Sequence, residues 1–211
     1  MSQIFFAFDS ETGGFNEKTA DLLTVYGAIM DEDYKILDEV YLKLKPDGRL
    51  PIAEAGALKV NGINLSAHLA DPETVIYAEG KKLLVNMLKK HLQKRGRFSN
   101  IMPFGYNVPF DERWLKEHLL PADEWESMLH YKSVDVMKTV DDLKRFGWFP
   151  RELGSLASVV EFLGLPARAA HNAKEDTLMT IDVDKKIIEI MKAKKEGGSN
   201  SQDLISLLEA E

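Results

Sequence analysis

The stretch IFFAFDSETGG, residues 4–14, decides the fold, because it joins an apolar run to a pair of carboxylates. Residues 4–8 are all apolar, which is typical of a strand that is covered on both faces. Asp9 and Glu11 follow at its end, and side chains two residues apart on a strand project to the same side, close enough to bind one cation together. Two glycines then permit a tight turn or a close approach to a ligand. Taken alone, an Asp-x-Glu pair is equally typical of a strand that ends in a turn.

A second acidic position, Asp111, lies in GYNVPFDERWL, residues 105–115. The preceding residues, 101–104, predict a short buried segment, and a turn rich in Gly, Asn and Pro leads from it into a helix. We expect Asp111 in the first two turns of that helix. An acid near a helix start is also a favourable partner for the helix dipole, so Asp111 alone does not define a site.

A third cluster, HNAKEDT at residues 171–177, adds an imidazole and a fourth carboxylate. An amphipathic helix is predicted from near His171 to Met191. Since Asp176 is five positions beyond His171, the two would not share a helix face, and we expect the histidine on the loop that leads into the helix and the aspartate inside it. A lone histidine is more often solvated or hydrogen bonded than functional. Four carboxylates and one imidazole together are what a two-magnesium phosphodiesterase needs, so the sequence predicts a nuclease.

The motifs D-x-E-T, G-Y-N-x-x-F-D and H-x-x-x-x-D, in this order, resemble those of the DEDDh (DnaQ-like) exonucleases, a group that includes polymerase proofreading subunits, RNase T and oligoribonuclease. The resemblance covers residues 4–190, and three motifs in order are far more specific than one. It implies an α/β protein with the ribonuclease H-like fold, a mixed sheet flanked by helices. Two departures leave substrate choice open. Ser10 and Gly13 vary the commoner Asp-Thr-Glu-Thr-Thr-Gly form, and Asn61 stands where proofreading subunits tend to carry a histidine.

The resemblance also implies the chemistry of the site. Hard oxygen ligands favour Mg²⁺ or Mn²⁺, and the chain has no cysteine to offer a thiolate. Asp9, Glu11 and Asp176 are expected to hold one ion, and Asp9 with Asp111, partly through water, the second. His171 is expected to be the general base that takes a proton from the attacking water. Cleavage would run from the 3′ end and release nucleoside 5′-monophosphates. The residues expected to contact the terminal nucleotide are Thr12, Gly13, Asn61 and Asn107.

Composition sets limits that agree with this chemistry. A chain of 211 residues with 45% hydrophobic content is expected to bury one core. The formal net charge of −7 argues against a large footprint on duplex nucleic acid, although an exonuclease needs to grip only a few nucleotides and its metal ions supply positive charge. No apolar stretch reaches membrane-spanning length and no signal pattern opens the chain. With no cysteines, a cytoplasmic protein of a bacterium or a phage-infected cell is expected.

Local patterns predict several further elements. Residues 22–30 and 35–44 have the composition of two strands joined by a polar turn. A helix is predicted from an Asp71 N-cap, with Pro72 in its first turn, to Leu92. The basic residues near Phe146, Trp148 and Phe149 are the better of two basic groups as a contact for a single strand, although these aromatics are equally compatible with a core.

The last residues differ in composition from the rest. We expect an exonuclease domain at 1–195, followed by a linker and short segment at 196–211 that is rich in Gly, Ser and Asn at its start. Residues 202–208, QDLISLL, loosely resemble the peptides with which bacterial replication proteins bind a sliding clamp, so a clamp or a polymerase is a candidate partner. A docked or frayed terminal helix explains the same residues.

Three functions therefore fit the sequence. The first is a 3′→5′ exonuclease on single-stranded or frayed DNA in replication or repair. The second keeps the chemistry but acts on RNA, as RNase T and oligoribonuclease do, since no residue is identifiable that accepts or rejects a 2′-hydroxyl. The third is a non-catalytic scaffold that binds nucleic acid or a polymerase. The five filled catalytic positions favour the enzymes.

Overall fold

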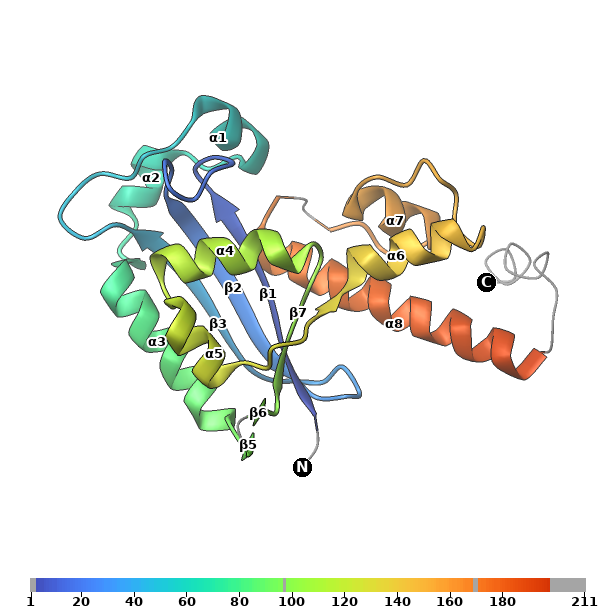
Figure 1. The fold of residues 1–211 in the computed structure, drawn as a ribbon. Coiled ribbons are helices and arrows are strands. Elements are labelled where there is room, and N and C mark those ends of the chain that lie inside the picture. Colours follow the sequence, from blue (N-terminus) through green and yellow to red (C-terminus); the bar gives the residue numbers. More distant parts are fainter. Residues whose placement is uncertain (1–2, 97, 169–170, 198–211) are drawn as a thin grey trace.

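A mixed six-stranded sheet forms the centre of the protein (Figure 1), in a computed structural model that describes residues 3–96, 98–168 and 171–197. Its strand order is β4-β3-β2-β1-β7-β8. The first three strands pair antiparallel, whereas β7, β8 and β4 add in parallel. This confirms the mixed sheet that was expected. The strands are β1 (Ile4–Thr12), β2 (Leu22–Met30), β3 (Ile36–Lys45), β4 (Thr74–Ile76), β7 (Ile101–Gly105) and β8 (Val134–Asp135), and a separate small hairpin joins β5 (Lys94–Arg95) to β6 (Phe98–Ser99).

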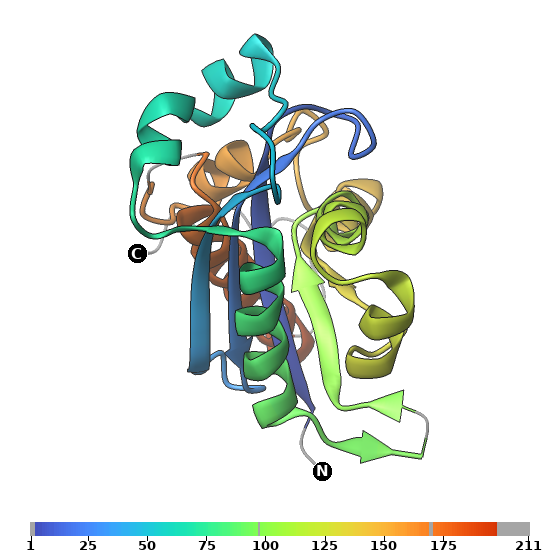
Figure 2. The same ribbon diagram turned by 90° about the vertical axis from the view of Figure 1, so that its left-hand side faces the viewer.

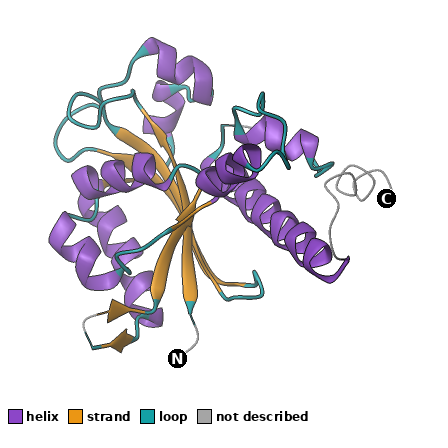
Figure 3. Cartoon of the chain, turned by 45° about the vertical axis from the view of Figure 1, so that its right-hand side comes forward, coloured by secondary structure: helices purple, strands orange, loops and turns teal. Residues whose placement is uncertain are grey.

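Helices cover both faces of this sheet, as Figures 2 and 3 show. One face packs on α3, α4 and α5, and the other on α6, α7 and α8. The flanking helices expected from the sequence are thus present. Within the described residues the helices are α1 (Ala55–Asn61), α2 (Leu65–Ala70), α3 (Tyr77–His91), α4 (Val108–His118), α5 (Ala122–Met128), α6 (Val136–Arg145), α7 (Leu156–Phe162) and α8 (Ala173–Gly197).

The alternation of side chains along β1 explains the two layers. Phe6 and Phe8 point to one face, where they stack at 4.8 Å between ring centroids and join the core with α3, α4 and α5. Ala7 points to the other face and joins the core with α6, α7 and α8. Helices therefore cover both faces of β1, and its carboxyl end lies between α4 and α8.

The antiparallel part of the sheet follows the predicted pattern closely. β2 has the predicted bounds, and β3 is shifted by one residue from the predicted 35–44. Asp31 organises the turn between them, because its Oδ1 accepts hydrogen bonds from the backbone N–H groups of Asp33 and Lys35. Tyr34 adopts a left-handed φ of 63° in this turn, and its hydroxyl donates to Asp184 of α8 at 2.8 Å.

The predicted helix start at Asp71 is wrong. Asp71 follows the end of α2, and its carboxylate accepts from the backbone N–H of Glu73 at 2.9 Å and from Lys43 at 2.7 Å. These bonds favour a turn, after which Thr74–Ile76 forms β4 in parallel with β3. The helix α3 begins only at Tyr77.

The end of the described chain leaves two predictions open. The helix α8 extends to Gly197, and residues 198–211, including the predicted clamp-binding segment 202–208, lie outside the described residues. The division at residue 195 therefore stays a prediction. Among the described residues, no helix has the length and apolar character needed to span a bilayer.

Candidate metal centre

Three carboxylates meet at the carboxyl end of β1. Asp9 and Glu11 extend from the strand and Asp176 from the first turn of α8, and one oxygen of each lies within 4.8 Å of the others. All three side chains are half-buried. Since carboxylates at this separation are suitable oxygen ligands for a divalent ion, the group is able to hold one.

The fourth carboxylate, Asp111, approaches from the opposite side of the strand. It lies in the first turn of α4, as expected, and is 4% exposed. The hydroxyl of Ser10 donates to its Oδ1 at 2.5 Å. Ser10 points to the α4 face of β1 while its two acidic neighbours point to the α8 face, so β1 brings acids from two different helices to one place. Ser10 is a departure from the family motif, and this contact gives it a structural role.

Burial, joined for Asp9 and Glu11 by the charges of neighbouring acids, raises the pKa values in this cluster. Burial raises the pKa of Asp9 well above its usual range, and the charges of Asp111, Asp176 and Glu11 add to the rise. Burial, followed by the charges of Asp176 and Asp111, raises the pKa of Glu11 to about 8. Burial also raises the pKa of Asp111 to about 7, against the opposing effect of its bonds from Ser10. A bound cation relieves such repulsion, so an all-oxygen cluster with raised pKa values fits a hard divalent ion.

His171 lies on the loop that leads into α8, as predicted, and Asp176 lies inside the helix. The histidine has a left-handed φ of 61°, and its backbone N–H donates to Asp176 Oδ2 at 3.2 Å. Its side chain is exposed and is not part of the carboxylate group. The backbone of His171 is therefore tied to Asp176, while its side chain is exposed to solvent.

Two of the four residues expected to contact nucleotide line a small cavity next to Glu11. This cavity has a volume of about 170 Å³, and Thr12 and Asn61 are part of its wall. The amide of Asn61 donates to the backbone oxygen of Thr12 at 3.1 Å. Phe15, which is 77% exposed, and Phe110 also line the cavity, and sequence analysis missed both.

The other two expected residues, Gly13 and Asn107, lie outside that cavity. Gly13 lies in a crowded turn, where an added Cβ would be 2.6 Å from the backbone oxygen of Ile52. Asn107 precedes α4 with a left-handed φ of 65°, and its backbone N–H donates to Asp135 Oδ1 at 3.0 Å. Both residues thus shape the backbone beside the carboxylates.

An ion pair between buried Asp21 and half-exposed Arg49 holds the Gly13 turn against the sheet. Asp21 is 1% exposed, and both of its oxygens accept from Arg49, at 2.6 and 2.8 Å. It also accepts from the backbone N–H of Ile52 at 2.6 Å. The backbone N–H of Gly13 in turn donates to the backbone oxygen of Asp21 at 2.7 Å. Asp21 therefore connects β2, the loop after β3 and the turn that follows the metal-binding pair.

We expect Asp21→Ala to lower the free energy of unfolding by about 2 kcal/mol, because it leaves a backbone N–H and a guanidinium without their partner. Urea unfolding measures this change. The matched control is Asp142→Ala, since Asp142 is 59% exposed and pairs with Arg145 on the surface, where ion pairs contribute less than about 1 kcal/mol. Equal stability of the two variants would contradict a structural role of Asp21.

The aromatic residues considered for a single-strand contact differ in their burial. Phe149 is 3% exposed and packs edge-on against Phe162, so it is core. Phe146 is 75% exposed, and Trp148 lies under the ammonium of Lys194 at 4.1 Å. Nearby cations are neutralised by adjacent acids, in the pairs Lys144–Asp141 and Arg145–Asp142.

Sequence comparison finds a relative among the DNA polymerases. No protein-family profile matches the chain. The DNA polymerase III PolC-type of Thermotoga petrophila is 26% identical over 192 residues, which cover 89% of this chain. The chain spans 12% of that polymerase.

Structure comparison finds exonuclease I. The chain superposes on Escherichia coli exonuclease I in complex with a dA16 oligonucleotide with a TM-score of 0.69 at 18% identity, covering 88% of this chain and 40% of that one. The exonuclease I of Methylocaldum szegediense gives 0.66 at 19% identity, with 89% and 40% covered. The chain thus spans about two fifths of these structures. It has their fold, which confirms the ribonuclease H-like architecture that the resemblance to the DEDDh exonucleases implies.

Proposed function

We propose that this protein is a metal-dependent 3′→5′ exonuclease that releases nucleoside 5′-monophosphates from single-stranded or frayed DNA ends. The observation that carries the proposal is the meeting of Asp9, Glu11 and Asp176 within 4.8 Å at the end of β1, with Asp111 beside them. The fold of exonuclease I supports the same activity. DNA is the proposed substrate because several of the matching exonuclease I structures are complexes with DNA oligonucleotides.

The residues of the cluster would divide the binding of Mg²⁺ or Mn²⁺ between them. Asp9, Glu11 and Asp176 would hold one ion, and Asp9 with Asp111 the second. Two such ions supply positive charge to the scissile phosphate and lower the pKa of water. Ser10 keeps the Asp111 carboxylate oriented through its hydrogen bond. The carboxylate charges gathered here favour the binding of cations.

His171 would act as the general base. Its side chain is exposed, next in the fold to Asp176, and would accept a proton from the attacking water. The backbone bond from His171 to Asp176 ties the position of the base to that of a metal ligand. The small cavity beside Glu11, with Thr12, Asn61 and Phe15 in its wall, would receive the terminal nucleoside, while Gly13 and Asn107 set the backbone around it.

We expect His171→Ala to lower kcat by about 10²-fold, which is the lower range for loss of a general base. The concentration of Mn²⁺ that gives half-maximal activity should change by less than about twofold, because the carboxylates that hold the ion are intact. Steady-state digestion across a manganese titration measures both quantities. His91→Ala provides a control histidine, since His91 pairs with Asp38 near the start of β3 and lines neither cavity. An unchanged kcat in His171→Ala would remove the histidine from the mechanism.

Digestion of labelled oligonucleotides tests the function itself. Matched DNA and RNA strands with a 5′ label are incubated with Mg²⁺, Mn²⁺ or a chelator. A metal-dependent ladder of shortened 5′-labelled DNA is expected, with RNA degraded more slowly. Faster degradation of RNA would assign the enzyme to RNA, and no cleavage of either strand would make it a binding scaffold.

The proposal that a sliding clamp binds this protein rests on residues 202–208 alone. These residues lie outside the described part of the chain. Deleting residues 197–211 tests it by pull-down on a bacterial sliding clamp. The deletion should abolish binding if the segment is the contact. Equal binding by both forms, or binding by neither, would contradict the partner.

A further inference from the structure

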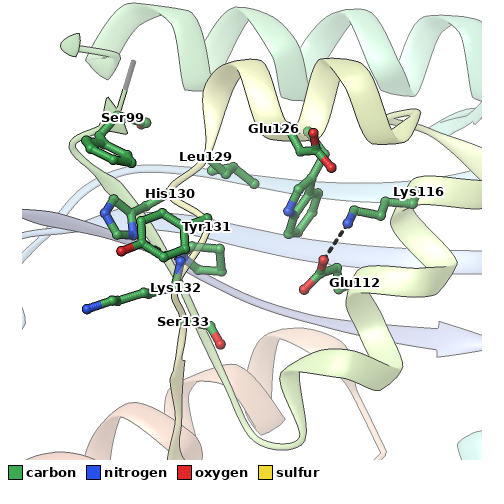
Figure 4. Close-up of a pocket in the computed structure, with 12 residues that line it drawn as sticks. Ser99, Glu112, Lys116, Glu126, Leu129, His130, Tyr131, Lys132 and Ser133 are labelled. Carbon is green, nitrogen blue, oxygen red and sulfur yellow. Dashed lines mark hydrogen bonds and ion pairs between the residues drawn. The ribbon is translucent and has the colours of Figure 1, made fainter. Parts of the chain in front are cut away.

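A second cavity, larger than the one beside Glu11, does not belong to the carboxylate site. It has a volume of about 530 Å³ and lies between α4, α5 and the segment 130–133 that precedes β8 (Figure 4). None of the four clustered carboxylates lines it. It is nevertheless connected to them, because α4 carries Asp111 toward β1 and the next residue, Glu112, toward this cavity. One helix thus forms part of both sites.

Stacked aromatic rings form one wall of this cavity. Tyr131 is 72% exposed, and its ring stacks on that of His130 with the centroids 4.6 Å apart and the planes inclined by 29°. Phe98 of β6 lies 5.5 Å from Tyr131 between centroids and is 41% exposed. An aromatic ring exposed to this extent contributes little to the core, so the stack presents an apolar, planar surface to the solvent.

The opposite wall combines an aromatic ring with an ion pair. Trp125 is 4% exposed, and the ammonium of Lys116 lies 5.5 Å from the centre of its ring. Lys116 also donates to Glu112 at 2.6 Å, which orients both side chains along the wall, as Figure 4 shows. The two walls face each other across the cavity.

The charges around the cavity are balanced, unlike those of the whole chain. Glu112 and Glu126 are matched by Lys116 and Lys132, whereas the chain as a whole carries −7. A net-neutral rim removes the repulsion that most of this acidic protein would exert on a phosphate backbone. The carboxylates can accept hydrogen bonds from the amino groups of a planar heterocycle, and the lysines can donate to its carbonyl or phosphate oxygens.

We propose that this cavity binds a nucleobase of a single-stranded nucleic acid, stacked on Tyr131, upstream of the 3′ end that is cleaved at the carboxylates. The proposal deepens the proposed exonuclease function and rests on it. A flat occupant is favoured because the exposed wall is a stack of rings, and stacking tolerates any base. The volume lies in the range of pockets that take ligands of nucleotide size.

Binding of a fluorescein-labelled dT12 strand in chelator tests this proposal, because the full chain then binds DNA without hydrolysing it. Tyr131→Ala is expected to raise the Kd about tenfold, which corresponds to the loss of one stacked base. Tyr131→Phe keeps the ring and should stay within about twofold of the wild type. Leu37→Ala is the control, since it removes an exposed apolar side chain, 43%, near the start of β3 and outside both cavities. Equal affinity of Tyr131→Ala and Leu37→Ala would overturn the proposal.

A photocrosslink provides a second test that needs no substitution. A dT12 strand containing 5-iodouracil is irradiated with the wild-type chain, and the crosslinked peptide is identified by mass spectrometry. Attachment at Tyr131, His130 or Phe98 supports the proposal, and attachment only outside the cavity overturns it.

Hydrolysis of a mononucleotide ester separates this proposal from the proposed function. The p-nitrophenyl ester of thymidine 5′-monophosphate has no upstream base, so Tyr131→Ala should hydrolyse it as fast as the wild type. If the wild type hydrolyses neither this ester nor DNA, the exonuclease function fails. If it hydrolyses both but Tyr131→Ala binds dT12 normally, the nucleobase site alone fails.

Discussion

Asp9→Asn is expected to lower the rate of 3′→5′ digestion by roughly 10³-fold or more, the scale of losing a main electrostatic contact to the transition state. Asp9 is the sharpest choice because it belongs to both proposed ion sites. It lies in the carboxylate group with Glu11 and Asp176, and its pKa is raised further by the charge of Asp111. The amide of asparagine keeps the size of the side chain but removes the charge that attracts the ions. Single-turnover digestion of 5′-labelled DNA measures the loss.

Two controls make that result specific. Asp142→Asn removes a negative charge from a surface position that is 59% exposed and should leave the rate unchanged. Circular dichroism should show that Asp9→Asn is folded, since the substitution relieves repulsion instead of creating a cavity. In chelator the variant should even unfold at a higher temperature than the wild type. A folded Asp9→Asn enzyme with full activity would refute the assignment of the cluster as the metal centre.

The elements that the sequence predicts well depend on short-range patterns. β1 and β2 are apolar runs, and the alternation of side chains in β1 is enough to place Asp9 and Glu11 on one face. The start of α8 follows from a similarly local pattern, and it brings Asp176 to the expected place. These predictions succeed because burial on both sides of a central strand leaves the local sequence few alternatives.

The elements that the sequence predicts poorly depend on contacts between distant residues. Asp71 has the local signature of a helix N-cap, yet Lys43, distant in sequence, binds its carboxylate. The hydrogen bond from Ser10 to Asp111 joins residues 101 positions apart, so no motif spacing reveals it. The cavity beside Tyr131 is also assembled from separate segments. A pattern of aromatic residues is visible in the sequence, but which rings face solvent is decided by the packing.

Stability in the absence of metal is expected to fall as the pH rises from about 4.5 to about 8, the ordinary and shifted pKa values of Glu11. Over this range the unfolded chain has already released the Glu11 proton, whereas the folded chain still holds it. Since the folded state binds more protons, each rise in pH favours the unfolded state. Asp111, with its pKa raised to about 7, acts in the same direction. For Glu11 the loss of unfolding free energy across this pH range is on the order of 3 kcal/mol. This figure is lower than the full linkage value because Glu11 is only half-buried and solvent screens its charge.

Urea unfolding in chelator at several pH values between 5 and 8 measures this loss, and Glu11→Gln isolates its source. Glutamine cannot ionise, so the variant should lose less stability across the window than the wild type. His118, whose pKa is lowered by burial, changes stability in the opposite sense and does so equally in both proteins. Saturating Mg²⁺ should flatten the wild-type curve as well, because the ion offsets the repulsion that raises the pKa values. A steep fall that persists in Glu11→Gln and in Mg²⁺ would show that the pH dependence arises elsewhere and that the carboxylates are not strained in the absence of a cation.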